Sequence, residues 1–207
     1  NLFDLASMIK SDRIIFIDVE KWSRKGRTHR AQIRNEQDTQ WINLPVVQED
    51  RKKAIREVRI DHSQQWFDPF WNAIHHNYKN ATWFDHFEDE LFFDFQQANN
   101  FEYLMNFNLY FFDRICAYLE IEISYELASS INEYSTFPAE TSEKLNVDTL
   151  FLEHGSKNYQ RQTPIAEIAL KEHPIYTQAY PGFEANCSCL DLLLNYGSES
   201  FRIIDTL

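Results

Sequence analysis

The spacing of apolar and polar residues along the first 60 positions predicts one helix followed by short strands. Four apolar residues recur on one helix face within residues 1–10, which are therefore expected to form an amphipathic helix. Residues 13–19 form a short apolar run containing one acid, Asp18, a pattern typical of a strand buried on both faces in a parallel or mixed sheet. Further short strands are expected at residues 41–47 and 58–60.

From residue 63 onward the apolar pattern becomes helical. Asp61 or Ser63 is expected to cap the first of these helices. Aromatic residues at helix spacing are explained by packing into a core, so no cofactor site is expected here. Residues 63–120 are therefore predicted to be a helical subdomain or insertion within a single domain spanning residues 1–207. The apolar stripes, rich in Phe and Trp, occupy residues 66–78, 84–95 and 104–119.

The following segment mixes strand and helix patterns. Residues 121–127 alternate between apolar and polar, as a strand does. A helix is expected over residues 141–154, with Gly155 as its stop. One or two short strands are expected within residues 159–170.

The last clear helix is expected to begin at Ser188. This serine and Asp191, three positions later, resemble a capping box, and Gly197 is placed to end the helix. Taken with the earlier elements, the pattern predicts an α/β or α+β fold. Its mixed, partly parallel sheet would come from the N- and C-terminal thirds, with a helical segment in the middle.

Composition narrows the class of protein. With 43% hydrophobic and 15% aromatic residues among 207, and four Gly and six Pro, the chain is neither disordered nor collagen-like. It has no run of 18 apolar residues and no expected secretory leader, so no membrane span is expected. Three cysteines do not make a disulfide framework. We therefore expect a cytoplasmic protein.

The net charge of -12 conceals an uneven distribution. The first 60 residues hold 13 Lys and Arg against nine acids, whereas the other 147 hold seven against 23. Residues 21–34 carry six basic residues and no acid. One basic island on an acidic protein does not favour nucleic-acid binding, which needs a broad basic face, but it suits one phosphate or carboxylate. A solvated basic loop explains the same charges.

The basic island directly follows the predicted strand that carries Asp18. Loops at the carboxyl ends of strands commonly hold the ligands of open α/β sheets. Asp18 is thus a candidate to act as a base, to orient an arginine or to bind a sugar hydroxyl, although an ion pair with Arg30 that fixes the loop would also explain it. The candidate anion-binding residues of the island are Arg24, Lys25, Arg27 and Arg30.

The sequence gives little evidence for a metal site or for a reactive cysteine. His75 and His76 are adjacent, so they cannot share one helix face as two metal ligands would, and no metal is expected. Cys187 and Cys189 have no partner pair at a zinc-binding spacing and no evident base beside them. They are predicted to be small buried residues near a helix start.

Two C-terminal motifs, at residues 173–183 and 188–197, resemble the WbqC-like family. His-Pro-Ile-Tyr-Thr-Gln and a following Gly-Phe match its Pro-x-Tyr-x-Gln element and Phe, and Ser-Cys-Leu-Asp-Leu-Leu-Leu-Asn-Tyr-Gly matches Ser-x-x-Asp-Leu-Leu-x-Asn-x-Gly. The apolar run up to Asp18, residues 29–33 and the Trp-Ile-Asn-Leu-Pro-Val of residues 41–46 agree with the front of the family pattern.

The resemblance has two departures. The family usually begins with a short strand and a Gln-Pro-x-Tyr-x-Pro loop, which we do not find ahead of the first predicted helix. His29 also stands where many relatives have Asn.

The resemblance implies a bacterial protein of O-antigen or other surface-polysaccharide biosynthesis. It further implies a transferase, with acyl or aminoacyl (glycine) transfer to a sugar as the suggested reaction. The substrate would be a small phosphorylated or carboxylated molecule, such as a sugar nucleotide or acyl donor, and no cofactor is expected.

Residue roles follow for such a transferase. Asp18 or His29 would be the catalytic base. The remaining substrate-binding candidates, besides the basic residues of the island, are Tyr176, Gln178, Ser188, Asp191 and Asn195. The alternative is a non-catalytic module of the same pathway, in which the basic island docks an acidic protein or a lipid-linked phosphate.

Overall fold

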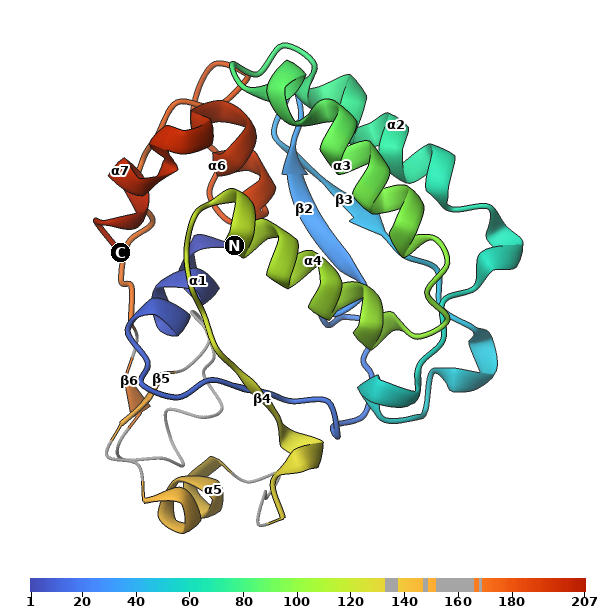
Figure 1. Cartoon of the computed structure of the whole chain (residues 1–207), viewed down its shortest axis with the longest axis vertical. Coiled ribbons are helices and arrows are strands. Elements are labelled where there is room, and N and C mark those ends of the chain that lie inside the picture. The colour runs from blue at the N-terminus through green and yellow to red at the C-terminus, as the bar shows by residue number, and fades with distance from the viewer. Residues whose placement is uncertain (133–137, 147–148, 152–165, 168) are drawn as a thin grey trace.

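The computed structural model describes residues 1–132, 138–146, 149–151, 166–167 and 169–207. A two-stranded hairpin lies among the helices, which come from both ends of the chain and from its middle (Figure 1). The helices are α1 (Leu2–Ile9), α2 (Phe67–Tyr78), α3 (Phe84–Ala98), α4 (Leu104–Tyr118), α5 (Pro138–Leu145), α6 (Cys189–Tyr196) and α7 (Phe201–Ile204). The strands are β1 (Ile15–Phe16), β2 (Arg30–Arg34), β3 (Thr39–Asn43), β4 (Glu126–Leu127), β5 (Leu150–Phe151) and β6 (Ala166–Glu167).

The mixed α/β class is confirmed, and two of the strand pairings are parallel. The single sheet that we expected is not formed by the described residues, whose strands make three separate pairs: β1 with β4, β2 with β3, and β5 with β6. The prediction of a strand buried on both faces was also wrong. Ile15 and Phe16 are half-buried and Ile17 is 44% exposed, because β1 has a strand partner on one side and no sheet around it.

The hairpin β2–β3 contains a strand that the sequence analysis missed. Its second strand, β3, was expected over residues 41–47 and spans Thr39–Asn43. Trp41 of β3 pairs with Gln32 of β2. The first strand, β2, is the second half of the basic island, where polar side chains alternate with Ala31 and Ile33. The expected strand at residues 58–60 is reduced to isolated bridges, Val46 with Ile60 and Arg59 with Tyr103.

The three helices of the middle segment are confirmed, but their caps differ from the prediction. Asp61 caps a 3-10 turn at residues 62–64 by accepting a hydrogen bond from the Ser63 amide, and α2 begins later, after Trp66. The helix expected over residues 141–154 was wrong in extent. The helix begins at Pro138 and ends at Leu145. The next residue, Asn146, has a φ of 51°, and β5 follows. Gly155, the expected stop, lies outside the described residues.

One hydrophobic core joins the middle helices to the hairpin and to α6. Phe84, Leu91 and Leu104 from the helices are packed in the same cluster as Ile33 of β2 and Leu193 of α6. This shared core is compatible with the predicted single domain, which stays a prediction. Among the described residues, no helix has both the length and the hydropathy needed to cross a membrane.

A buried carboxylate, Asp191 in the first turn of α6, joins four segments of the chain. Its oxygens accept hydrogen bonds from the Tyr78 hydroxyl at the end of α2 (2.9 Å), from the Tyr176 hydroxyl (2.8 Å) and from the Gln178 amide (2.9 Å). The Tyr78 hydroxyl in turn accepts the backbone N–H of Arg34 in β2 at 3.0 Å. Asp191 is fully buried, so these donors replace the water that it loses on folding.

The capping box expected at the start of α6 is only half formed. The Ser188 hydroxyl accepts the Leu190 amide, as a cap does, but the carboxylate of Asp191 points into the network instead of back to residue 188. Gly197 ends α6 as expected, with a φ of 52°, and a Cβ there would collide with the Trp83 ring. Sequence spacing alone does not distinguish a capping acid from an acid that other elements hold.

We predict that Asp191→Asn lowers the free energy of unfolding by about 3 kcal/mol, because an amide nitrogen would face donors that need an acceptor. For a chain of this length, the melting temperature should fall by roughly 6–12 °C in a calorimetric scan. Asp205→Asn is the matched control, since Asp205 is exposed just beyond α7. Equal melting temperatures for the two variants would contradict a stabilising role of the network.

Candidate functional site

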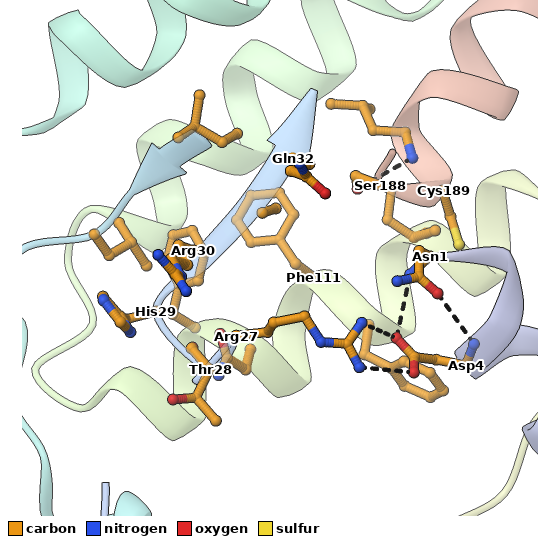
Figure 2. A pocket seen from close by; sticks show the side chains of 18 of the residues that line it. Asn1, Asp4, Arg27, Thr28, His29, Arg30, Gln32, Phe111, Ser188 and Cys189 are labelled. Atoms are coloured by element: carbon orange, nitrogen blue, oxygen red, sulfur yellow. Dashed lines mark hydrogen bonds and ion pairs between the residues drawn. The ribbon is translucent and has the colours of Figure 1, made fainter. Parts of the chain in front are cut away.

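A cavity of about 920 Å³ lies between the basic loop at residues 25–30, the hairpin, α1, α4 and the start of α6. The volume is in the range of small-molecule sites. Figure 2 shows its polar side: Arg27 and Arg30 from the loop, Gln32 from β2, Asp4 from α1, and Ser188 with Cys189 from α6. The site thus combines residues that are as far apart as 1 and 190 in the sequence.

Arg30 organises the basic loop by binding the loop's own backbone. Its Nε donates to the carbonyl oxygen of Gly26 at 3.1 Å, and its Nη2 donates to that of Lys25 at 2.8 Å. The guanidinium also lies 4.2 Å from the centre of the Trp41 ring on β3, a cation–π contact. These contacts hold the loop against the hairpin, and Lys25, an exposed residue of the loop, is among the residues that line the cavity.

Arg27 reaches from the loop to α1. It forms a two-pronged ion pair with Asp4, with Nη1 and Nη2 each donating to one carboxylate oxygen at 2.8 and 2.9 Å (Figure 2). Both side chains remain about one third exposed, at 37% and 31%, so solvent weakens the pair. An anionic ligand could therefore compete with Asp4 for this guanidinium at little energetic cost.

His29 borders the cavity with an unused ring nitrogen. Its ring packs on Trp22, with centroids 4.9 Å apart, and no described residue accepts from or donates to Nδ1, although that atom is buried. Burial, with the charges of Arg30 and Arg51 nearby, lowers the pKa of His29 below its usual 6.5. The imidazole is therefore neutral at pH 7 and able to accept a proton.

The adjacent residue, Thr28, ties the loop to α4. The Asn108 amide donates to the Thr28 carbonyl oxygen at 2.8 Å, while the buried Thr28 hydroxyl has no hydrogen-bond partner among the described residues. Both residues line the cavity. The loop backbone is thus held at a definite place on α4.

The start of α6 supplies the opposite edge of the cavity. The Ser188 amide donates to the Gln32 carbonyl oxygen of β2 at 2.8 Å, which fixes the helix N-terminus against the hairpin. Ser188, Cys189 and Leu190 all line the cavity. A helix N-terminus carries partial positive charge, so this edge adds to the basic character of the loop.

The structure brings five of the sequence-predicted site residues together around this cavity: Lys25, Arg27, His29, Arg30 and Ser188. Arg24 is exposed on the same loop but outside the lining. Asp18 is buried elsewhere, and its oxygens accept the Ser129 amide (2.9 Å) and hydroxyl (2.5 Å). It does not pair with Arg30, so that alternative was wrong.

The C-terminal candidates lie away from the large cavity. Tyr176 and Gln178 have their polar groups in the Asp191 network, and Gln178 also holds the backbone of Glu184 at both its N–H and C=O. The Asn195 amide donates to the Asp191 carbonyl oxygen at 2.7 Å, one helical turn back. Tyr176 and Gln178 also border a second pocket, formed by residues 175–183 and Tyr196.

The apolar wall of the cavity was not expected from the sequence. Aromatic residues of α4 were attributed to core packing, yet Phe111 and Phe112 line the cavity and are half-buried. The pattern contained one indication: Phe residues in α4 occupy more than one helix face, which is more than a single core contact needs. Asn108, in the same helix, also went unnoticed.

The cysteines differ in their surroundings. Cys187 is buried as expected, whereas the same prediction was wrong for Cys189, which is half-buried at the cavity; Cys116 is also buried. Burial, with the nearby Asp191 carboxylate, raises the pKa of Cys187 to about 12, and burial raises that of Cys116 to about 11. In the described part of the chain, no three His, Cys, Asp or Glu side chains are grouped so as to hold a metal ion.

Comparison with known proteins gives a family match over most of the chain. The model of the WbqC-like protein family matches residues 3–203. The chain is 27% identical over 212 residues to the uncharacterized protein Rv1507c of Mycobacterium tuberculosis, an alignment covering 96% of this chain and 89% of that protein. No solved structure is significantly similar to the chain.

We predict that iodoacetamide at pH 8 modifies Cys189 first in the folded protein. Cys116 and Cys187 should react at least about a hundredfold more slowly, because their raised pKa values leave little thiolate and their sulfurs are buried. Mass spectrometry of tryptic peptides at timed intervals would measure the three rates. Urea should make the three rates equal, and Cys189→Ser should remove the fast phase. Equal rates in the folded protein would show that the cavity does not expose Cys189.

Proposed function

The chain belongs to the WbqC-like protein family, and from this membership we propose that it is a transferase of bacterial surface-polysaccharide biosynthesis whose substrate site is the large cavity. The observation that carries the proposal is the basic loop held at the edge of a large cavity in a protein of net charge -12. We place the reaction in the cytoplasm, in the O-antigen or a related pathway. The transferred group would be an acyl or aminoacyl group, and the acceptor a sugar.

The anionic group of the donor would bind between Lys25 and Arg27. Lys25 is exposed on the loop, and Arg27 can exchange its solvent-screened bond to Asp4 for a phosphate or carboxylate. Arg30 would act through the loop, because its guanidinium holds the carbonyls of residues 25 and 26. This assignment divides the basic candidates into two that contact substrate and one that positions them.

His29 would be the general base. Acyl transfer to a hydroxyl or an amine requires a group that takes up the proton of the attacking atom. His29 lines the cavity, and its neutral imidazole has a buried Nδ1 without a hydrogen-bond partner among the described residues, whereas both carboxylate oxygens of Asp18 are occupied by Ser129 away from the cavity. The partial positive charge at the start of α6 would stabilise negative charge on the reacting carbonyl oxygen, although the amides of Ser188 and Leu190 themselves bind Gln32 and the Ser188 hydroxyl.

Tyr176, Gln178, Asp191 and Asn195 receive a structural role in this proposal. Their polar atoms bind one another or nearby backbone, so they would act by holding α6 in place and not by contacting substrate. The family motif at the C-terminus would then be needed to form the site without being part of it.

The second candidate function is a non-catalytic binding module of the same pathway. It is favoured by one observation: among the described residues, no side chain at the cavity pairs a nucleophile with a base. In that case, the basic loop would hold a ligand or the acidic surface of a partner, and no product would form. Turnover separates this function from the transferase, whereas binding is common to both.

We predict that Arg27→Gln and Lys25→Gln each weaken the binding of a phosphorylated donor about tenfold or more, because each removes a charged donor to the anion. A thermal-shift panel of sugar nucleotides, acyl-coenzyme A and inorganic phosphate would identify the donor class, since a ligand at 100 times its Kd adds about 2.7 kcal/mol. Arg24→Gln is the matched control on the same loop, outside the cavity. A loss as large in this control would indicate diffuse electrostatic attraction instead of a site.

We predict that His29→Gln reduces the transfer rate by roughly 10²–10⁴-fold while leaving donor affinity within about twofold. Because the pKa of His29 is lowered, the base stays neutral down to a lower pH than a free histidine, so the wild-type rate should fall only below pH 6.5. Product formation from the donor found above, followed by mass spectrometry across pH 4–8, would measure both effects. No product at any pH, with donor binding intact, would favour the non-catalytic module.

A further inference from the structure

The cavity has an apolar wall that the proposed chemistry does not use. Phe111 and Ile115 of α4 line it one helical turn apart, and Phe107 continues the same helix face toward the N-terminus. From residue 107 to 115 this stripe is about 12 Å long, at 1.5 Å per residue. The further apolar residues around it that are half-buried at the cavity are Met8, Phe16, Phe70 and Phe112.

These wall residues differ from the aromatic residues of the core. Phe84 and Phe87 of α3 are 1% and 8% exposed and do not line the cavity, whereas Phe111, Phe112 and Ile115 of α4 line it and are only half-buried. When a ligand covers apolar surface that faces a cavity, that surface is removed from water, and this makes the free energy of binding more favourable. A cavity that only needed to hold a small polar group such as glycine would gain nothing from such a wall.

The basic loop and the apolar stripe meet at a defined point. Asn108, next to Phe107 at the beginning of the stripe, binds the Thr28 carbonyl oxygen of the loop. The loop backbone therefore meets the stripe near Phe107, whereas the Arg27 guanidinium reaches across to Asp4 of α1, one helical turn from Met8 in the same lining. A cavity lined by both basic residues and apolar side chains is the complement of an amphipathic molecule.

We propose that the cavity binds a linear aliphatic chain with an anionic head group: the head group at Lys25 and Arg27, and the chain along Phe111 and Ile115. The inference deepens the proposed function and rests on it, since it selects an acyl or alkyl group over glycine as the group that occupies the site. The shared chemistry is a phosphate or carboxylate on hydrocarbon, and both head groups enter the test.

Titration calorimetry of the full chain with n-alkyl phosphates of two to ten carbons, below their micelle concentrations, tests the proposal. Affinity should rise about fourfold for each added methylene until the wall is covered, since each buried CH₂ contributes about the transfer free energy of hydrocarbon. The corresponding fatty acids show whether the site prefers a carboxylate. Inorganic phosphate measures the head group alone.

The outcomes separate this inference from the proposed function. Inorganic phosphate and every alkyl phosphate binding equally well would overturn the aliphatic-chain site and leave the anion site standing. Failure of all of them to bind, together with no response to any phosphorylated donor, would overturn both. If affinity in Arg27→Gln still rises with chain length, and all affinities are lower than in the wild type by the same factor, the result would support both the anion site and the aliphatic-chain site.

Variants of the wall provide the second test. Phe111→Ala should reduce the gain per methylene to about twofold or less without changing the affinity for inorganic phosphate. Because Phe111 also packs on Phe95, with ring centroids 4.3 Å apart, Met8→Ser is the second variant: Met8 lines the cavity but is outside the core cluster. Phe93→Ala is the control, since Phe93 is 58% exposed on α3 and does not line the cavity. An unchanged gain in both wall variants would refute the placement of the chain.

Discussion

The buried carboxylate of Asp191 is the interaction on which the arrangement of this protein depends. A carboxylate removed from water is unfavourable by several kcal/mol unless hydrogen-bond donors replace the solvent. Here the donors come from Tyr78 of α2 and from Tyr176 and Gln178 of the C-terminal segment, and Tyr78 also holds the backbone of β2. The network is complete only when all four segments are in their native positions. It therefore links the position of α6 to the rest of the core.

This linkage explains how a cavity can be built from distant parts of the chain. Ser188 begins α6 and donates its amide to Gln32 in β2, three residues before Asp191 enters the network. The basic loop is set independently, by Arg30 binding its carbonyls and by Asn108 of α4 binding Thr28. Two separate sets of hydrogen bonds thus fix the two polar edges of the cavity. The apolar wall of α4 lies in the same cavity lining and completes it.

The elements that the sequence predicted well are those whose stability is local or strongly periodic. The helices α2, α3 and α4 follow from apolar stripes several turns long, and the Gly197 stop follows from the conformation that glycine permits. Predictions failed where pairing decides structure. The strand β2 was overlooked because its alternation lies within a basic run, and residues 141–154 were called one helix although the chain turns at Asn146. A two-residue strand such as β1 has too short a pattern to show which of its faces is covered.

The sequence by itself determined the composition of the site: a basic island next to a predicted strand, a C-terminal motif of polar residues, and aromatic helices. Only the tertiary structure decided what these residues do. It separates Asp18 and Asp191, each enclosed by its own hydrogen bonds, from Arg27 and His29 at the cavity. It also places Phe111, which packs on Phe95 of the core, in the wall of the cavity. The physical reason is that hydrophobic periodicity specifies which face of an element is buried, but not which element it meets. Long-range contacts make that choice, and with it they decide whether a charged group is satisfied internally or left available to a ligand.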